Sequence, residues 1–207
     1  MKMKTRDRIL HASLVLFNDH GEPNVTTLQI ADELDISPGN LYYHFKSKGD
    51  IVTELYGWYE HQINDLLDVP EVEISLEDQW LFLHLLFEAI ARFRFLYQDL
   101  VNVLSRYTHL QPKFQRVLKR KRKATERICL SLREQGVLRA NDQELDALCE
   151  QIVLTLSYWL SFEMLTHLQH KDNVDLGRGV YQVMALLAPY LREDERAMLA
   201  SMSEDYL

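Results

Sequence analysis

The sequence is poor in glycine, proline and cysteine, and each shortage narrows the class of protein. It has 7 Gly and 5 Pro in 207 residues, which is too few turn formers for a loop-rich β protein. Its two cysteines, Cys129 and Cys149, lack CxxC spacing and lie in helical patterns, so we expect two reduced thiols in a core. These shortages indicate a helical protein of the cytoplasm.

Long uncharged runs and catalytic sets are also absent from the sequence. No run reaches the ~18 residues that a membrane span requires, and Met1 to Lys4 opens directly into an amphipathic helix, which predicts no signal peptide. We find no Ser-His-Asp set, glycine-rich phosphate loop or paired carboxylate at a useful spacing. We therefore expect a protein that is not an enzyme, has no membrane partner and needs no cofactor.

The stretch from Thr26 to Lys48 has the pattern of two short helices joined by a turn. Thr26 is an N-cap residue before an amphipathic stripe, and Asp35 tolerates the left-handed backbone of a turn. Ser37 followed by Pro38 starts the second helix, because proline lacks the N–H that would be orphaned at that position. The stretch predicts a helix-turn-helix.

The second helix of this pattern buries only Leu41 and Phe45, and its remaining surface lacks the Lys and Glu of a solvated helix. The residues that are there suit close approach to a DNA duplex: a glycine has no side chain in the way, an asparagine offers a paired donor and acceptor, and two tyrosines offer rings. The predicted base contacts are Gly39, Asn40, Tyr42 and Tyr43, with Gln29 as a further candidate. The predicted phosphate contacts are Thr27, Tyr42, His44 and Lys48.

The same residues resemble the DNA-binding domain of TetR-family transcriptional regulators. The matching motifs, over roughly the first 50 to 60 residues, are Leu16-Phe17, Thr26-Thr27, Ile30-Ala31, Ser37-x-Gly39, Leu41-Tyr42-x-His44-Phe45 and Lys48. Asp35 replaces the usual turn glycine, and Pro38 and Asn40 depart from the family on the reading face, so the operator sequence does not follow from the resemblance. The resemblance implies a homodimer that binds a near-palindromic operator and responds to a small-molecule effector.

The rest of the chain reads as helices. A connecting helix is predicted from about 48 to 67, with further helices at about 76–95, 97–107, 111–135, 141–167 and 176–191, and then a polar tail. We assign residues 1–50 to a helix-turn-helix DNA-binding domain and 51–207 to a helical ligand-binding and dimerisation domain. The helix at 76–95 is apolar nearly all round and predicts a buried central helix.

The helix at 141–167 has apolar residues on more than one face, so we expect a second partner for it. Together with Val180, Tyr181, Met184 and Leu187 of the next helix, it predicts half of a four-helix dimer interface. A fully interior helix of a monomer is the alternative.

The larger domain offers weaker hints of chemistry than the helix-turn-helix does. The candidate ligand-binding residues are Trp58, His84, Phe87, Glu88, Lys121, Trp159 and Phe162. The aromatic residues among them equally suit a plain core, and His84 and Glu88, four residues apart on one helix, could simply hydrogen-bond to each other. Lys121 falls on an apolar stripe, so it either snorkels to solvent or faces a buried anion such as the acidic head of a ligand. His167-x-x-His170 lacks further ligands nearby, so no metal site is predicted.

Charge is distributed unevenly along the chain. The formal net charge is −8, yet residues 1–50 carry six basic and seven acidic groups, a balance of −1, with the basic groups at the two ends of the stretch. We expect modest, strongly salt-sensitive non-specific DNA binding. The sequence thus predicts a ligand-responsive, DNA-binding repressor with an effector of apolar character. The alternative is a DNA-bound adaptor of the same fold that is controlled by a protein partner.

Overall fold

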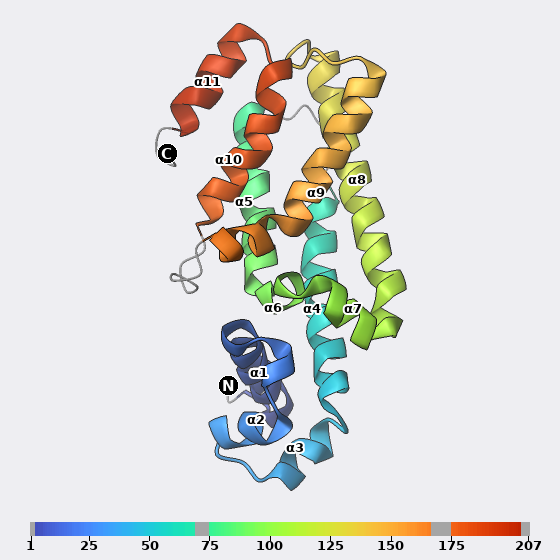
Figure 1. Ribbon diagram of the computed structural model, residues 1–207, viewed down its shortest axis with the longest axis vertical. Helices are drawn as coiled ribbons and strands as arrows, with labels where there is room; N and C mark the ends of the chain where they lie inside the picture. The colour runs from blue at the N-terminus through green and yellow to red at the C-terminus, as the bar shows by residue number, and fades with distance from the viewer. Residues whose placement is uncertain (1–2, 69–74, 167–174, 204–207) are drawn as a thin grey trace.

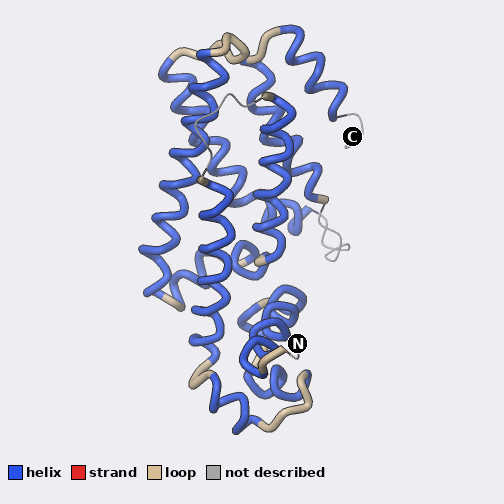
Figure 2. The backbone as a smooth tube through the Cα atoms, turned by 180° about the vertical axis from the view of Figure 1, so that it is seen from behind, coloured by secondary structure: helices blue, strands red, loops and turns tan. Residues whose placement is uncertain are grey.

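The protein is all-α, and the computed structural model describes residues 3–68, 75–166 and 175–203 (Figure 1). Helix α1 (Thr5–His20) and two short helices form a lower unit beside the N-terminus, and one long helix leads from this unit into a larger bundle. Viewed from behind, the regular elements of the described chain are all helical (Figure 2). The predicted fold class is therefore confirmed.

The lower unit forms as its local sequence signals predict. Thr26 caps α2 by accepting from the Gln29 backbone N–H, and Asp35 takes a left-handed φ of 52° in the turn. Ser37 caps α3 in the same way, with Pro38 as the first helical residue. The elements of this unit are α1 (Thr5–His20), the 3₁₀ turn η1 (Glu22–Asn24), α2 (Thr27–Glu33) and α3 (Pro38–His44).

The connecting helix is α4 (Lys48–Leu67), as its predicted range had it, and it begins with a capping box of Ser47 and Asp50. It contacts α1 of the lower unit as well as α5 and α8 of the bundle, so it belongs to both cores. The larger bundle contains α5 (Leu76–Arg92), α6 (Arg94–Gln98), α7 (Leu100–Arg106), η2 (Thr108–Leu110), α8 (Gln111–Glu134), α9 (Asp142–Thr166), α10 (Leu176–Leu187), η3 (Ala188–Tyr190) and α11 (Glu193–Ser203).

The predicted end of the helix at 76–95 is wrong, because the helix is interrupted at Phe93, between α5 and α6. Asn18 of α1 explains the break: its Nδ2 donates to Arg92 O at 2.9 Å, and its Oδ1 accepts from Phe95 N at 3.0 Å. The amide side chain thus forms hydrogen bonds with free backbone groups at the end of α5 and at the start of α6. The same contact ties the lower unit to the bundle.

Two other expectations for the bundle are also wrong. The α5 helix is not buried all round, since Leu81 is 60% exposed and Leu85 is 40% exposed. Residues 193–203 form α11 rather than a polar tail, and Leu199 of this helix is buried. A short helix with one buried leucine has too little periodicity to be recognised from its sequence.

The predicted dimer face on α10 lies largely inside the protomer. Val180, Met184 and Leu187 are buried, and α10 packs against α5 and α9. The exposed apolar side chains occur instead on α9, at Leu154, Tyr158, Phe162 and Leu165. Their spacing of four, four and three residues makes a single stripe along that helix.

The two cysteines are free thiols in the core, as predicted. Cys129 on α8 and Cys149 on α9 are both buried, and their thiols are hydrogen-bonded to each other. This hydrogen bond, together with burial, raises the pKa of Cys129 above its ordinary value.

Candidate DNA-binding interface and its junction with the larger domain

The exposed face of α3 is made of the residues predicted to read bases. Leu41 and Phe45 point into the core of the lower unit, which leaves Gly39, Asn40, Tyr42 and Tyr43 on the outside. Tyr43 is 85% exposed and Tyr42 is 48% exposed, both unusual for large aromatic side chains. The face therefore presents rings, one amide and one position without a side chain.

Thr27 and Tyr42 are brought together although 15 residues separate them. Their hydroxyl groups lie 2.9 Å apart, which joins the start of α2 to the exposed face of α3. Next to them, the His44 ring stands edge-on to the Tyr43 ring with 5.1 Å between centroids. Thr27 of α2 is therefore held against α3, the helix that carries Tyr42, Tyr43 and His44.

Gln29 is occupied by helix capping. Its Oε1 accepts from the backbone N–H of Thr26 at 2.8 Å and from the Thr26 hydroxyl at 3.0 Å. The side chain is exposed, but its carbonyl oxygen is held back against the start of α2. The same capping box that makes α2 predictable thus restricts the use of Gln29 in base reading.

Lys48 lies at the junction of the lower unit and the bundle, and not on an open surface. Its Nζ bonds to Glu22 Oε1 at 2.9 Å, to Glu22 O at 2.8 Å and to Val25 O at 3.0 Å. An ammonium group has three N–H donors, so all of them have partners inside the protein. In this arrangement the Lys48 side chain has no donor left for a phosphate, which differs from its predicted role.

Glu22 is the residue that sequence reasoning missed. Its side chain is fully buried, and it receives Lys48 together with two residues of the larger domain, Arg106 and Tyr107. Tyr107 OH donates to Glu22 Oε1 at 2.7 Å, and Arg106 pairs with Glu22 Oε2. One carboxylate therefore joins η1, the start of α4 and the end of α7, and its partners are too distant in sequence to give any local signal.

A groove of about 680 Å³ runs beside the first turns of α4. Thr53 on α4 and His109 of η2 meet across its far side, with Oγ1 and Nε2 2.8 Å apart. Arg6 on α1 pairs with Glu54 at 2.6 Å and lies over the Phe45 ring. The groove is lined by side chains of both signs, at the edge where α3 and α4 meet.

The predicted ligand-binding residues are dispersed over the bundle. Phe87 and Trp159 both approach Gly179 of α10, since a Cβ added there would lie 2.8 Å from an atom of either ring. Trp58 instead packs on His11 of the lower unit, with 5.1 Å between ring centroids. Glu88 and Phe162 are exposed, His84 is half-buried beside Trp80, and Lys121 is buried.

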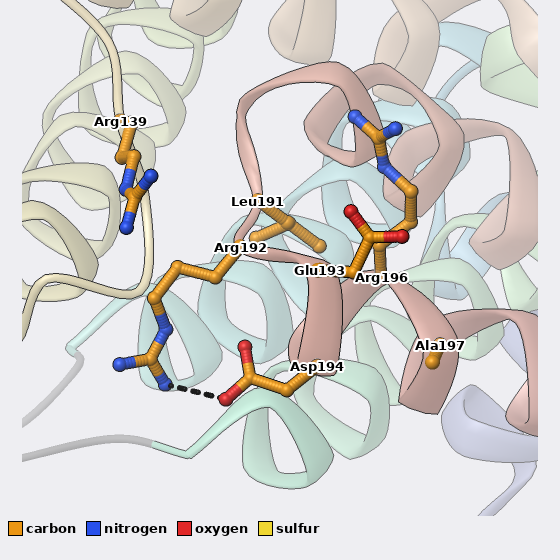
Figure 3. Close-up of a pocket in the computed structure, with 7 residues that line it drawn as sticks. All are labelled: Arg139, Leu191, Arg192, Glu193, Asp194, Arg196 and Ala197. Atoms are coloured by element: carbon orange, nitrogen blue, oxygen red, sulfur yellow. Dashed lines mark ion pairs between the residues drawn. The ribbon is translucent and has the colours of Figure 1, made fainter.

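A second groove, of about 670 Å³, lies at the start of α11 (Figure 3). Arg192 pairs with Asp194 at 3.3 Å, the dashed line in Figure 3. It also pairs with Glu195 at 2.9 Å. Arg196 donates through Nε to Ala188 O at 3.0 Å. Because Arg192 is paired with its own neighbours and the groove is lined by charged side chains of both signs, we assign no ligand to this groove.

Neither a membrane span nor a metal cluster occurs in the described parts of the chain. No helix there is both long and apolar enough to cross a bilayer. No group of three or more His, Cys, Asp or Glu there is arranged to hold a metal ion. The His167-x-x-His170 pair lies outside the described residues.

This geometry places the chain among all-α proteins that carry an N-terminal helix-turn-helix on a larger helical domain. Two family models match it. Residues 9–55 match "Bacterial regulatory proteins, tetR family", and residues 58–199 match "Bacterial transcriptional repressor". The chain belongs to the TetR family.

Individual relatives are consistent with this assignment. A TetR-family transcriptional regulator from Marinobacter aquaeolei VT8 superposes with a TM-score of 0.88 at 37% identity, covering 99% of both chains. A transcriptional regulator from Saccharomonospora viridis, solved in complex with choline, has a TM-score of 0.67 at 20% identity, covering 91% of this chain and 98% of that one. The probable HTH-type transcriptional regulator YttP of Bacillus subtilis is 26% identical over 110 residues, or 53% of this chain and 51% of YttP. The chain thus spans about half the length of that curated relative.

Proposed function

We propose that the protein is a sequence-specific, DNA-binding transcriptional repressor that acts as a homodimer and responds to a small molecule. The observation that carries this proposal is the exposed face of α3, where Tyr42, Tyr43 and Asn40 stand on a rigid, capped helix. Exposed aromatic rings and an amide contribute little to folding at this place. They are suited to the edges of bases in a major groove.

Positioning on the DNA comes from groups around this face. The joined hydroxyls of Thr27 and Tyr42 and the ring of His44 are placed to meet phosphate oxygens beside α3. The first turn of α4 adds backbone N–H groups with the positive end of the helix dipole. The carboxylate of Glu22 with its partners Lys48, Arg106 and Tyr107 is called the Glu22 junction below. In this proposal Lys48 contributes through its backbone N–H and through this junction, while its ammonium group stays inside the protein.

Dimerisation is assigned to α9. Leu154, Tyr158 and Phe162 form its exposed apolar stripe, which continues to Leu165. A contiguous apolar stripe on a surface helix is expected to be covered by a partner, and an isologous contact of two such helices gives a twofold dimer. Two α3 helices related by that axis would read two half-sites of an inverted repeat.

Response to a ligand is assigned to α4, because this helix is shared by the two domains. It starts beside α3 and packs further along on α5 and α8. A ligand that binds better when α4 is displaced would change the spacing of the two α3 helices and release the DNA. The Glu22 junction moves with α4, since Lys48 is part of it.

Selection from a pool of random duplex DNA tests this function. We expect the wild-type protein to enrich an inverted repeat, and Tyr42→Ala to enrich none while keeping its dimer and its melting temperature. If a folded, dimeric wild-type protein enriches no sequence at all, the proposed function is wrong.

A further inference from the structure

Lys121 is a positive charge inside the bundle without a negative partner. It lies on α8, is 1% exposed, and therefore does not snorkel to solvent. Its Nζ forms one hydrogen bond, to Tyr97 OH at 2.9 Å, and lies 5.1 Å from the centroid of the Tyr97 ring. Within the described residues no carboxylate pairs with it, so two of its three donors have no partner.

The Tyr97 hydroxyl connects this amine to two further tyrosines on α4. Tyr97 of α6 shares a hydrogen bond with Tyr59 of α4, with 2.5 Å between the two oxygens. Tyr56, one turn earlier on α4, stacks edge-on to Tyr59 with 5.6 Å between centroids, and its buried hydroxyl has no hydrogen-bond partner. The cluster of Lys121, Tyr97, Tyr59 and Tyr56 thus holds unused donors as well as a buried charge.

The rest of the surroundings is apolar. Phe114 lies 6.2 Å from the Tyr97 ring and Phe93 lies 5.9 Å from the Tyr59 ring, and both are buried. In such a setting a lone ammonium group is disfavoured, and burial lowers the pKa of Lys121 to about 7. A methionine would fill the same space without this penalty, so packing does not account for a lysine at this position.

We propose that the small molecule sensed by this protein is an organic monocarboxylate with an apolar body, whose carboxylate binds Lys121 and the tyrosine hydroxyls beside it. The inference rests on the proposed ligand-responsive function and names the class of its effector. One cation and several neutral donors match a single negative charge, whereas a phosphate ester would need further cations. The phenyl and phenol rings supply the apolar wall.

Binding at this position is linked to the DNA-binding face through α4. Tyr56, Tyr59 and Lys121 are buried, so a carboxylate reaches Lys121 only if the helices around it move apart, and α4, which carries both tyrosines, is one of them. The same α4 starts at Ser47 beside α3. The acid therefore favours a displaced α4, which is the change that releases DNA.

The test compares two acids with their neutral amides: octanoate with octanamide, and phenylacetate with phenylacetamide. Binding is measured by calorimetry and by loss of operator affinity. We expect at least one acid to bind the wild-type protein and weaken its operator binding, with its amide weaker by about tenfold or more. Lys121→Met should lose this preference, and Lys123→Met, an exposed lysine on the same helix, should keep it.

Equal affinity for acid and amide, no binding of either acid by the wild type, or unchanged acid binding by Lys121→Met would each overturn the inference. The acid and amide comparison on the wild type stands even if Lys121→Met does not fold. Failure here leaves the proposed function intact if the protein still selects an inverted repeat. If no operator is selected, the proposed function itself is wrong, whatever the acids do.

Discussion

The hydroxyl of Tyr107 donates to the buried carboxylate of Glu22 across 2.7 Å, and this contact joins the larger domain to the DNA-binding unit. Because Lys48 and Arg106 share the same carboxylate, η1, α4 and α7 meet at one point. Any displacement of α4 relative to α7 has to change this arrangement. In the proposed mechanism, the Glu22 junction is therefore the place where a displacement of α4 would be transmitted between the larger domain and α3.

Glu22→Gln tests the stability that this junction contributes. The substitution keeps the shape of the side chain but leaves Lys48 and Arg106 without a negative partner. Both of them retain some access to water, so we expect a loss of about 1–3 kcal/mol in the free energy of unfolding by urea, below the value for a fully buried pair. Glu33→Gln, at an exposed position on α2, should change it by less than about 0.5 kcal/mol. Equal stability of the two variants would contradict the role given to Glu22.

Gly39→Ala separates folding from DNA binding. An added Cβ would meet only Ser37 Oγ, at 3.9 Å, and Gly39 does not need a positive φ, so stability should stay constant or rise by up to about 1 kcal/mol. The added methyl group stands on the reading face, so operator affinity should fall roughly tenfold or more. Gly57→Ala on α4, where a Cβ meets nothing within 4 Å, is the matched control and should keep operator affinity. Undiminished binding by Gly39→Ala would show that this part of α3 does not approach the duplex closely.

Phe162→Glu tests the α9 interface. A carboxylate in the middle of the apolar stripe should disfavour its burial against a partner, so light scattering should report a monomer and operator binding should weaken. Val101→Glu, which alters a 63% exposed apolar residue on α7, should remain dimeric. If both variants remain dimers, the interface lies elsewhere.

Lys121 predicts a pH dependence of stability. Its pKa is about 7 in the folded protein against an ordinary value of 10.5, so the unfolded chain binds more protons between these two pH values. Stability therefore rises with pH through this window, by at most about 1.4 kcal/mol per pH unit for this single group. Tyr59 and Tyr97 stay neutral there, because burial raises the pKa of both.

The measurement is urea unfolding of the wild type and of Lys121→Met at pH 7 and pH 9.5. The variant should be the more stable at pH 7, and its advantage should shrink at pH 9.5, because the stability of the wild type rises with pH through this window while the variant has no amine to titrate there. An advantage that does not depend on pH would contradict the burial of a titrating amine at this place.

Much of the fold could be predicted because its signals are local. The caps at Thr26, Ser47 and Asn141 each lie within three residues of their partners, and Gly136 stops α8 with a positive φ of 70°. The exposed side chains of α3 were predictable for the same reason, since two buried positions on a short capped helix fix the remaining ones.

What the sequence could not reveal depends on distant contacts. The break at Phe93 is made by Asn18, and the burial of Glu22 depends on Arg106 and Tyr107. The α9 helix has apolar residues on more than one face, so periodicity alone did not show that its Leu154 face, and not α10, is left exposed.

The most direct test of base reading by α3 is a parallel selection of random duplex DNA with the wild type and Asn40→Ala. Asn40 is exposed, and it contacts the Ser37 cap through its backbone N–H and not through its side chain, so the variant should fold and dimerise normally. We predict an inverted repeat for both proteins, with base preference relaxed in the variant at one symmetry-related pair of positions. Identical sequence preferences for both proteins would contradict the account, because Asn40 on α3 would then not read the DNA.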